Sequence, residues 1–148
     1  MYDMIAQQMN ASLPFVAHNG IRVTRIADGE GEAVFPQTGQ SLNHIGTQHA
    51  GGLFTLGETA SGAAMTGAFA PMILNVLPLA AEASIRYLAV AKGDITAMAR
   101  VEGEPTDLRA AIEADGVARF PVKVTLADMD GATVAEMTVR WNVRKKGG

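Results

Sequence analysis

The sequence has no cysteine, which excludes disulfides, a thiolate nucleophile and cysteine-ligated zinc. Charged residues are also scarce, at 18% of the 148 positions, whereas 48% of the residues are apolar. This combination indicates a globular chain whose surface is partly covered by a partner subunit, so we expect a homo-oligomer. The lack of cysteine also suits a cytoplasmic protein.

An excess of positive charge is missing as well. Twelve basic and fifteen acidic side chains give a net charge of −3, which excludes the strongly basic surface of a nucleic-acid-binding protein. One basic cluster is interpreted as a solvated tail because it lies near the end of the chain: Arg140, Arg144, Lys145 and Lys146. Residues 1–12 lack the basic region and apolar core of a secretory signal.

One long uncharged run covers residues 59–81 and has the length of a membrane span. Pro71 and Pro78 interrupt any helix in this run, and Asn75 lies between them. We therefore expect the end of a buried helix, a loop and then a strand. Neither a membrane nor nucleic acid is expected as a partner.

The remaining patterns predict an alternation of helices and short-linked strands. A short helix is expected over about residues 1–12, a long helix with hardly any polar face over 48–66, and a helical turn over 104–116. Strands are predicted over 21–28, 31–37, 81–92, 94–103, 118–129 and 132–145. Because the connections are short, we expect antiparallel pairing, with the last four strands in consecutive hairpins.

A nearly all-apolar helix needs cover on most of its sides, which one antiparallel sheet provides only if it curls around the helix. Glycines at 52, 57, 62 and 67 recur every fifth residue and allow a close approach of the backbones. The sequence therefore predicts an α+β chain with one domain over residues 1–148. Its architecture is the hotdog fold, in which a curved antiparallel sheet wraps around one long central helix.

The stretch "NHIGTQHAGGLFTLGE" resembles a motif of hotdog-fold thioesterases of the phenylacetate-degradation (PaaI-like) type. There, N-x-x-G-T-x-H-G-G leads into the central helix, and an acid follows the histidine by nine residues. The matching positions here are Asn43, Gly46, Thr47, His49, Gly51 and Glu58. Residues 81–101 are similar to the family's next strand pair, so the likeness covers roughly residues 20–145. It implies an acyl-CoA thioesterase without a cofactor, since coenzyme A is part of the substrate.

The candidate catalytic residues lie along this motif. Glu58 is surrounded by apolar residues and glycines, which favours a raised pKa and the role of general base or, alternatively, nucleophile; a solvent-facing carboxylate is the plain alternative. A helix that begins near His49 leaves the Ala50 N–H without an intrahelical acceptor, so it can bind the thioester oxygen. Asn43 can add its amide to that oxygen or simply form a turn. His49 has either a functional role, orienting the loop or lying near the thioester sulfur, or a plain role as a capping or packing residue at the helix start.

Substrate contacts are expected from Gly51, from Phe54 in an acyl tunnel and from Lys92 beside the phosphates of coenzyme A. Several other residues fit these roles equally well, namely Met65, Phe69 and Met72 for the tunnel and Arg86, Arg109 and Arg119 for the phosphates. The plain alternative for Phe54 and the other tunnel residues is that they belong to the core. The resemblance also implies an active site between two protomers of a homodimer or homotetramer. No metal site is expected, because His44, His49 and Glu58 lack a zinc-binding spacing.

The chain departs from the family pattern at two positions. Ala50 replaces a glycine but keeps the backbone N–H, and Ala80 stands where some relatives carry Ser or Thr to position the attacking water. Ala80 favours a first alternative, a non-catalytic acyl-CoA binding or sensing domain. The second alternative is a 3-hydroxyacyl thioester dehydratase, because His44 and Glu58 are fourteen residues apart, although the proline-glycine signature of such enzymes is absent.

Overall fold

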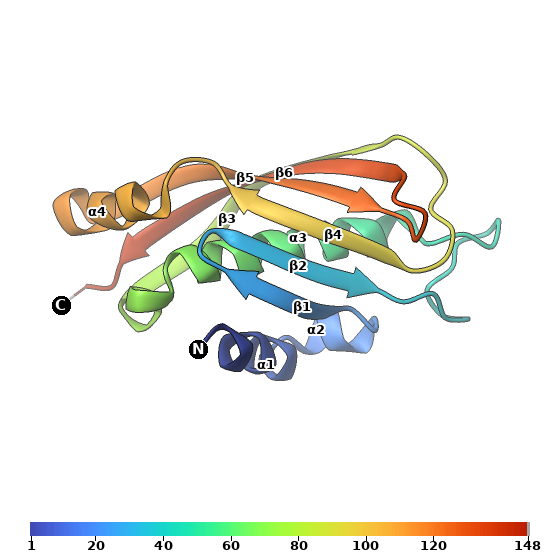
Figure 1. The fold of residues 1–148 in the computed structure, drawn as a ribbon, viewed down its shortest axis with the longest axis horizontal. Helices are drawn as coiled ribbons and strands as arrows, with labels where there is room; N and C mark the ends of the chain where they lie inside the picture. Colours follow the sequence, from blue (N-terminus) through green and yellow to red (C-terminus); the bar gives the residue numbers. More distant parts are fainter. Residues whose placement is uncertain (148) are drawn as a thin grey trace.

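The computed structural model describes residues 1–147, and its six strands form one antiparallel sheet beside a long helix (Figure 1). The strand order is β1-β2-β4-β5-β6-β3. The strands are β1 (Arg22–Ala27), β2 (Glu30–Phe35), β3 (Val76–Tyr87), β4 (Ile95–Val101), β5 (Val117–Ala127) and β6 (Thr133–Lys145). The helices are α1 (Tyr2–Ser12), α2 (Pro14–His18), α3 (Ala50–Ala68) and α4 (Pro105–Asp115), and a 3-10 segment, η1, covers Ala70–Asn75.

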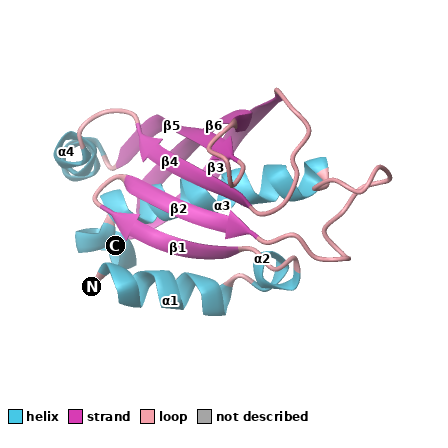
Figure 2. Ribbon diagram, turned by 45° about the vertical axis from the view of Figure 1, so that its right-hand side comes forward, coloured by secondary structure: helices cyan, strands magenta, loops and turns pink. Residues whose placement is uncertain are grey.

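The long helix α3 lies across one face of the curved sheet (Figure 2), which confirms the predicted hotdog fold. Glycines bring the two layers into direct contact. A methyl group at Gly52 would overlap the ring of Phe35 in β2, and one at Gly67 would overlap the carbonyl oxygen of Ala27 in β1. The predicted close approach is therefore present at these two positions, and it seats the helix on the strands.

One predicted strand pairing is wrong. The sequence predicts a hairpin between residues 81–92 and 94–103, but β3 begins five residues earlier, at Val76, and pairs with β6. Strand β4 instead lies between β2 and β5. The connection over residues 88–94 is a crossover that runs from edge strand β3 past β6 and β5 to the inner strand β4. Gln48 holds this crossover, since its backbone N–H donates to Ala91 O and its side chain to Gly93 O.

The segment after β4 forms a helix of eleven residues, α4, where only a helical turn was expected. Its Arg109 donates to Ala68 O at 2.6 Å and contacts Asp28 at 3.1 Å. A cation at this place stabilises the negative end of the α3 dipole. Arg109 therefore has a structural role and is not a candidate for binding the phosphates of coenzyme A.

The basic residues near the chain end are exposed, as expected, but they do not form a tail. Arg140, Arg144 and Lys145 belong to β6, which pairs with β5 and β3. The apolar run over residues 59–81 is divided among the end of α3, η1 and the start of β3, as expected. Within residues 1–147, none of the helices combines the length and the apolar character that a membrane span requires.

Candidate active site

Helix α3 begins at one end of the sheet, where the loop over residues 36–49 and the crossover over 88–94 also lie (Figures 1 and 2). His49 is the N-cap residue, with φ −66° and ψ 136°, and its Nδ1 accepts a hydrogen bond from Gly51 N at 2.8 Å. The acceptor in this bond is the lone pair of the imidazole Nδ1. Of the two predicted roles for His49, the structure shows the cap.

The backbone around Ala50 is fixed on both sides. Leu53 N donates to His49 O at 3.0 Å, and the hydroxyl of Tyr87 donates to Ala50 O, also at 3.0 Å. For the Ala50 N–H itself, residues 1–147 provide no acceptor. It therefore points out of the positive end of α3 as an open donor, the arrangement that stabilises a developing oxyanion.

Asn43 organises the loop before the helix. Its Oδ1 accepts from Ile45 N at 3.1 Å and Thr47 N at 3.0 Å, and its Nδ2 donates to Thr47 Oγ1 at 2.8 Å and Gln48 O at 3.4 Å. Both amide hydrogens are thus engaged within the loop. In this structure Asn43 is the turn former that the sequence analysis gave as one of its two possible roles.

Gln48 supports the same loop and was missed by the sequence analysis. Its side chain is 2% exposed, and Nε2 donates to Phe35 O and Gly93 O, both at 3.1 Å. The motif loop is therefore fixed both to the end of β2 and to the crossover. Amides in polar loops are ordinarily exposed, so no pattern distinguished Gln48 from its neighbours.

Glu58 lies two turns along α3, half-buried, and its carboxylate has no hydrogen-bond or ion-pair partner among residues 1–147. Burial raises the pKa of this carboxyl group. Phe54, which is 36% exposed, precedes Glu58 by one turn on the same stripe of the helix. The sheet leaves this stripe open in the first half of α3, whereas the second half is buried.

The backbone at Glu58 is anchored to the sheet. Ser61 Oγ donates to Glu58 O at 2.7 Å and accepts from Trp141 Nε1 at 3.3 Å. Trp141 lies in β6 directly opposite Ala80 of β3. Ala80 is thus the cross-strand neighbour of Trp141, and it provides a methyl group at this position and no hydroxyl.

The structure does not bring the two halves of the predicted site together within one chain. Ala50 and Glu58 are eight positions apart on α3 (58 minus 50), which separates them by about 12 Å along the helix axis. A single thioester carbonyl cannot contact both groups at this separation, because hydrogen bonds are about 3 Å long.

The other predicted residues are dispersed. Lys92 is exposed in the crossover at the same end of the molecule as the start of α3. Met65 and Phe69 are buried in the core, which is the plain alternative for these residues, and Met72 is partly buried. His44 is exposed, and no group of three His, Cys, Asp or Glu side chains within residues 1–147 could hold a metal ion.

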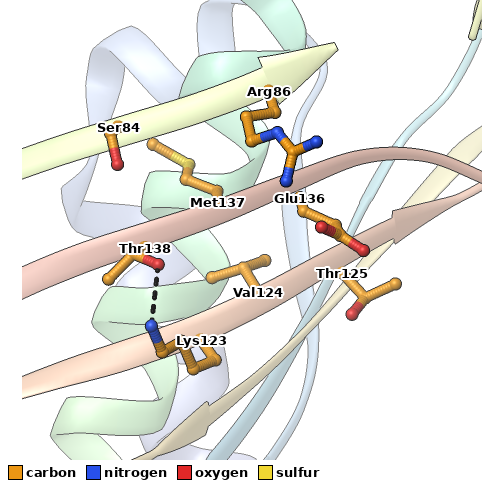
Figure 3. Close-up of a pocket in the computed structure, with 8 residues that line it drawn as sticks. All are labelled: Ser84, Arg86, Lys123, Val124, Thr125, Glu136, Met137 and Thr138. Carbon is orange, nitrogen blue, oxygen red and sulfur yellow. Dashed lines mark hydrogen bonds between the residues drawn. The ribbon is translucent and has the colours of Figure 1, made fainter. Parts of the chain in front are cut away.

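A shallow groove of about 350 Å³ runs beside the helix start. It lies between the motif loop, the first turn of α3 and the crossover, and its lining is mostly apolar, with Ile45, Leu53, Leu88 and Val90 among its residues. A different pocket, on the outer face of β3, β5 and β6, is polar and includes Arg86, Lys123 and Glu136 (Figure 3). Of the candidate catalytic residues, Asn43 and Ala50 line the groove, and none lines the outer pocket.

The curved sheet around one long helix places the chain in the class of hotdog-fold proteins, which also contains solved structures described as thioesterases. Within this class, the chain belongs to the family described as "Domain of unknown function (DUF4442)", whose model matches residues 3–143. No curated protein matches the chain.

Several solved structures share the fold. A Pseudomonas aeruginosa protein of unknown function, PA5026, described as a probable thioesterase, is 28% identical with a TM-score of 0.87, over 99% of this chain and 97% of that chain. PaaI of the Escherichia coli phenylacetic acid degradation operon is 20% identical with a TM-score of 0.74, over 99% and 94%. A candidate thioesterase from Shewanella oneidensis is 20% identical with a TM-score of 0.79, over 98% and 97%.

Proposed function

We propose that this chain hydrolyses acyl-CoA thioesters at a site shared by two copies of the chain. The observation that carries the proposal is the state of Glu58, a half-buried carboxylate with a raised pKa and no partner, about 12 Å from the open Ala50 N–H. We propose a two-fold symmetric dimer in which the Glu58 of each copy lies opposite the helix start of the other, since contacts in such a dimer are reciprocal. Each dimer then has two complete sites.

In this reaction Glu58 accepts a proton from a water molecule while the water oxygen attacks the thioester carbon. The carbonyl oxygen becomes negatively charged and is held by the Ala50 N–H of the other copy. The C–S bond then breaks, and the leaving thiolate takes up the proton from Glu58. Burial favours this role, because a raised pKa makes the Glu58 carboxylate a stronger base near neutral pH.

The exposed edge of β3 is the surface on which a second copy fits. Leu88 N donates to Val134 O, beyond the end of β3. Hydrogen bonding in an antiparallel pair alternates between the two sides of a strand, so Ala83, Ile85 and Tyr87 direct their backbone groups away from β6. An edge with such unpaired groups is a template for another strand.

Two features limit the pairing to the second half of β3. The register shifts between Ala80 and Glu82, and Pro78 has no N–H to offer a partner strand. We therefore place the contact between copies over residues 83–87. This segment lies at the end of the sheet where the motif loop and the start of α3 are found.

The apolar groove beside Ala50 is the proposed place for the acyl group, with Phe54 of the open stripe adding apolar surface. Lys92 is exposed in the crossover, next to Ala91 of the groove lining, and we assign it to the phosphates of coenzyme A. Asn43 shapes the groove, and its longest bond, to Gln48 O at 3.4 Å, is the one that a substrate oxygen would replace.

A second candidate function is binding of acyl-CoA without turnover. Two observations favour it, namely the methyl group of Ala80 in place of a hydroxyl beside Trp141, and the engagement of both Asn43 amide hydrogens within the loop. In this case the groove and the helix start hold the ligand, and Glu58 activates no water.

A thiol-release screen over short-chain, long-chain and aryl-acyl-CoA esters tests the proposal. We expect turnover in the unchanged protein and a decrease in kcat of about 10² to 10⁴ in Glu58→Gln, the contribution of a positioned general base. Glu136→Gln, at an exposed position on the outer face, is the matched control and should keep full activity. Binding of the esters without thiol release supports the sensing function, and a new enoyl absorbance from 3-hydroxyacyl-CoA supports the dehydratase.

A further inference from the structure

Tyr87 connects two parts of the molecule that are far apart in sequence. It is the last residue of β3, on the exposed edge, and its hydroxyl donates to Ala50 O in the first turn of α3 at 3.0 Å, across 37 positions of sequence. Its side chain is 49% exposed and also lines the groove beside the helix start. From the sequence, only the similarity of residues 81–101 to the family's strand pair concerns Tyr87.

The hydrogen bond from Tyr87 completes a set of contacts around one open donor. The peptide between Ala50 and Gly51 is held at its carbonyl by Tyr87 and at its N–H by His49 Nδ1, at 2.8 Å. The preceding peptide is held at its carbonyl, since His49 O accepts from Leu53 N at 3.0 Å. The Ala50 N–H belongs to this preceding peptide, between His49 and Ala50. It therefore lies between two fixed carbonyl groups, those of His49 and Ala50. A donor held this way needs little reorganisation when charge develops on a substrate oxygen.

The chemistry of a phenol suits this task. A tyrosine hydroxyl donates one hydrogen bond, which phenylalanine cannot replace, although the two rings have nearly the same shape. A tyrosine hydroxyl keeps its proton at neutral pH at its ordinary pKa of about 10, and burial raises the pKa of Tyr87 further. The ring is attached to the strand that we assign to the contact between copies, so ordering of that strand also orders the hydroxyl.

We propose that Tyr87 is a positioning residue that fixes the direction of the Ala50 N–H and thereby links the exposed edge of β3 to the active site. This inference rests on the proposed function, because it assigns the Ala50 N–H to the thioester oxygen. Tyr87 acts through the first peptide of α3 and does not touch the reacting atoms.

Tyr87→Phe tests the inference kinetically. Tyr2→Phe is the matched control, because Tyr2 is the other of the two tyrosines in the chain and packs from α1 against β1. In Tyr87→Phe we expect kcat to fall about threefold to tenfold, the size of one neutral hydrogen bond, with KM and the oligomeric state unchanged. Tyr2→Phe should keep both constants. A decrease in kcat that accompanies dissociation of the oligomer would assign Tyr87 to the subunit contact and overturn the inference.

Amide hydrogen exchange, followed by NMR on the same variants, needs no substrate. In Tyr87→Phe the amides of Gly51 and Leu53 should exchange about threefold to tenfold faster, while the amides of β5 and β6 keep their rates. Unchanged exchange rates at Gly51 and Leu53 overturn the inference whatever the kinetics show. Faster exchange at these two amides with an unchanged kcat also overturns it. If the unmodified protein releases no thiol, the proposed function fails, and the exchange rates still show separately whether Tyr87 fixes the helix start.

Discussion

The two edges of the sheet differ in whether their backbone groups are covered by another part of the chain. At the β1 edge, the side chain of Asn10 in α1 bonds to both backbone groups of Val23, at 2.8 and 2.9 Å, and Ile5 and Met9 pack against the same strand. At the β3 edge, a strand of twelve residues pairs with β6 alone, and Leu77, Leu79 and Tyr87 are 49–53% exposed. One edge is closed by the chain's own helix, and the other is open.

This difference shows where a second copy is expected. Natural sheets cover or charge their edges to avoid pairing with other chains, so a long apolar edge left open marks an interface. The open edge also lies beside the start of α3, where Tyr87 contacts Ala50. The open strand edge and the divided site therefore support the same proposal, a dimer formed through β3.

The largest effect is expected from Ala83→Pro, which removes an edge-facing N–H of β3 without removing a bond to β6. The variant should be monomeric by sedimentation, and its thioesterase activity should fall by about 10² to 10⁴, because each site loses its general base. Ile85→Lys, which charges the same edge, is the second variant if Ala83→Pro does not fold. A monomer with full activity would contradict the shared site.

Ala50→Pro is expected to be the next largest effect, with a decrease in kcat of about 10² to 10³. Proline is tolerated at the first position of a helix, and the extended backbone of His49 suits the residue before a proline. The substitution thus removes the Ala50 N–H and little else, and the dimer should persist. Full activity in a folded Ala50→Pro dimer, measured by thiol release, would exclude this N–H as the oxyanion donor.

At the closed edge, Asn10→Ala should lower stability and leave catalysis intact. It leaves the backbone N–H and C=O of Val23 unpaired, which costs about 1 to 2 kcal/mol and lowers the melting temperature by roughly 2 to 8 °C. Calorimetry and thiol release on the same sample measure both properties. If Asn10→Ala lost as much activity as Ala83→Pro, both edges would affect catalysis, which would contradict the proposal that only the β3 edge contributes to the active site.

The smallest predicted effect is a gain in stability from Glu58→Gln. The raised pKa means that the folded state holds the Glu58 proton more tightly than the unfolded state, so the ionised carboxylate destabilises the fold above that pKa. At pH 7 the variant should therefore melt higher, on the order of 2 °C, and the gain should vanish as the pH falls below the ordinary glutamate pKa. A gain that persists at low pH would point to a cause other than ionisation. The acidic limb of kcat/KM should likewise lie above the ordinary glutamate pKa.

Much of the fold could be predicted from local patterns. The apolar helix with its glycines, the strand alternation and the Asp130-Gly131 turn all depend on residues close in sequence, and they indicated a sheet curled around a helix. The partner of β3 could not be predicted this way. Its pairing with β6 joins residues about 50 to 70 positions apart, and nothing within the 88–94 segment distinguishes a crossover from a turn.

The candidate site was predictable in its residues but not in its contacts. Glu58 and the helix start near Ala50 followed from the motif spacing, whereas the roles of His49 as cap and of Asn43 as turn former depend on side-chain geometry. The hydrogen bond from Tyr87 and the anchor through Trp141 and Ser61 join distant elements. Such contacts leave no periodic signal in the chain.

The most direct test of the shared site is complementation between two inactive variants. Glu58→Gln keeps its helix-start donor, and Ala50→Pro keeps its general base, so a mixed dimer contains one intact site. When the two are co-expressed in equal amounts, half of the dimers are mixed and half of their sites are intact, so about one quarter of the unmodified activity should return. A mixture no more active than the two variants measured separately would contradict a site built from two copies.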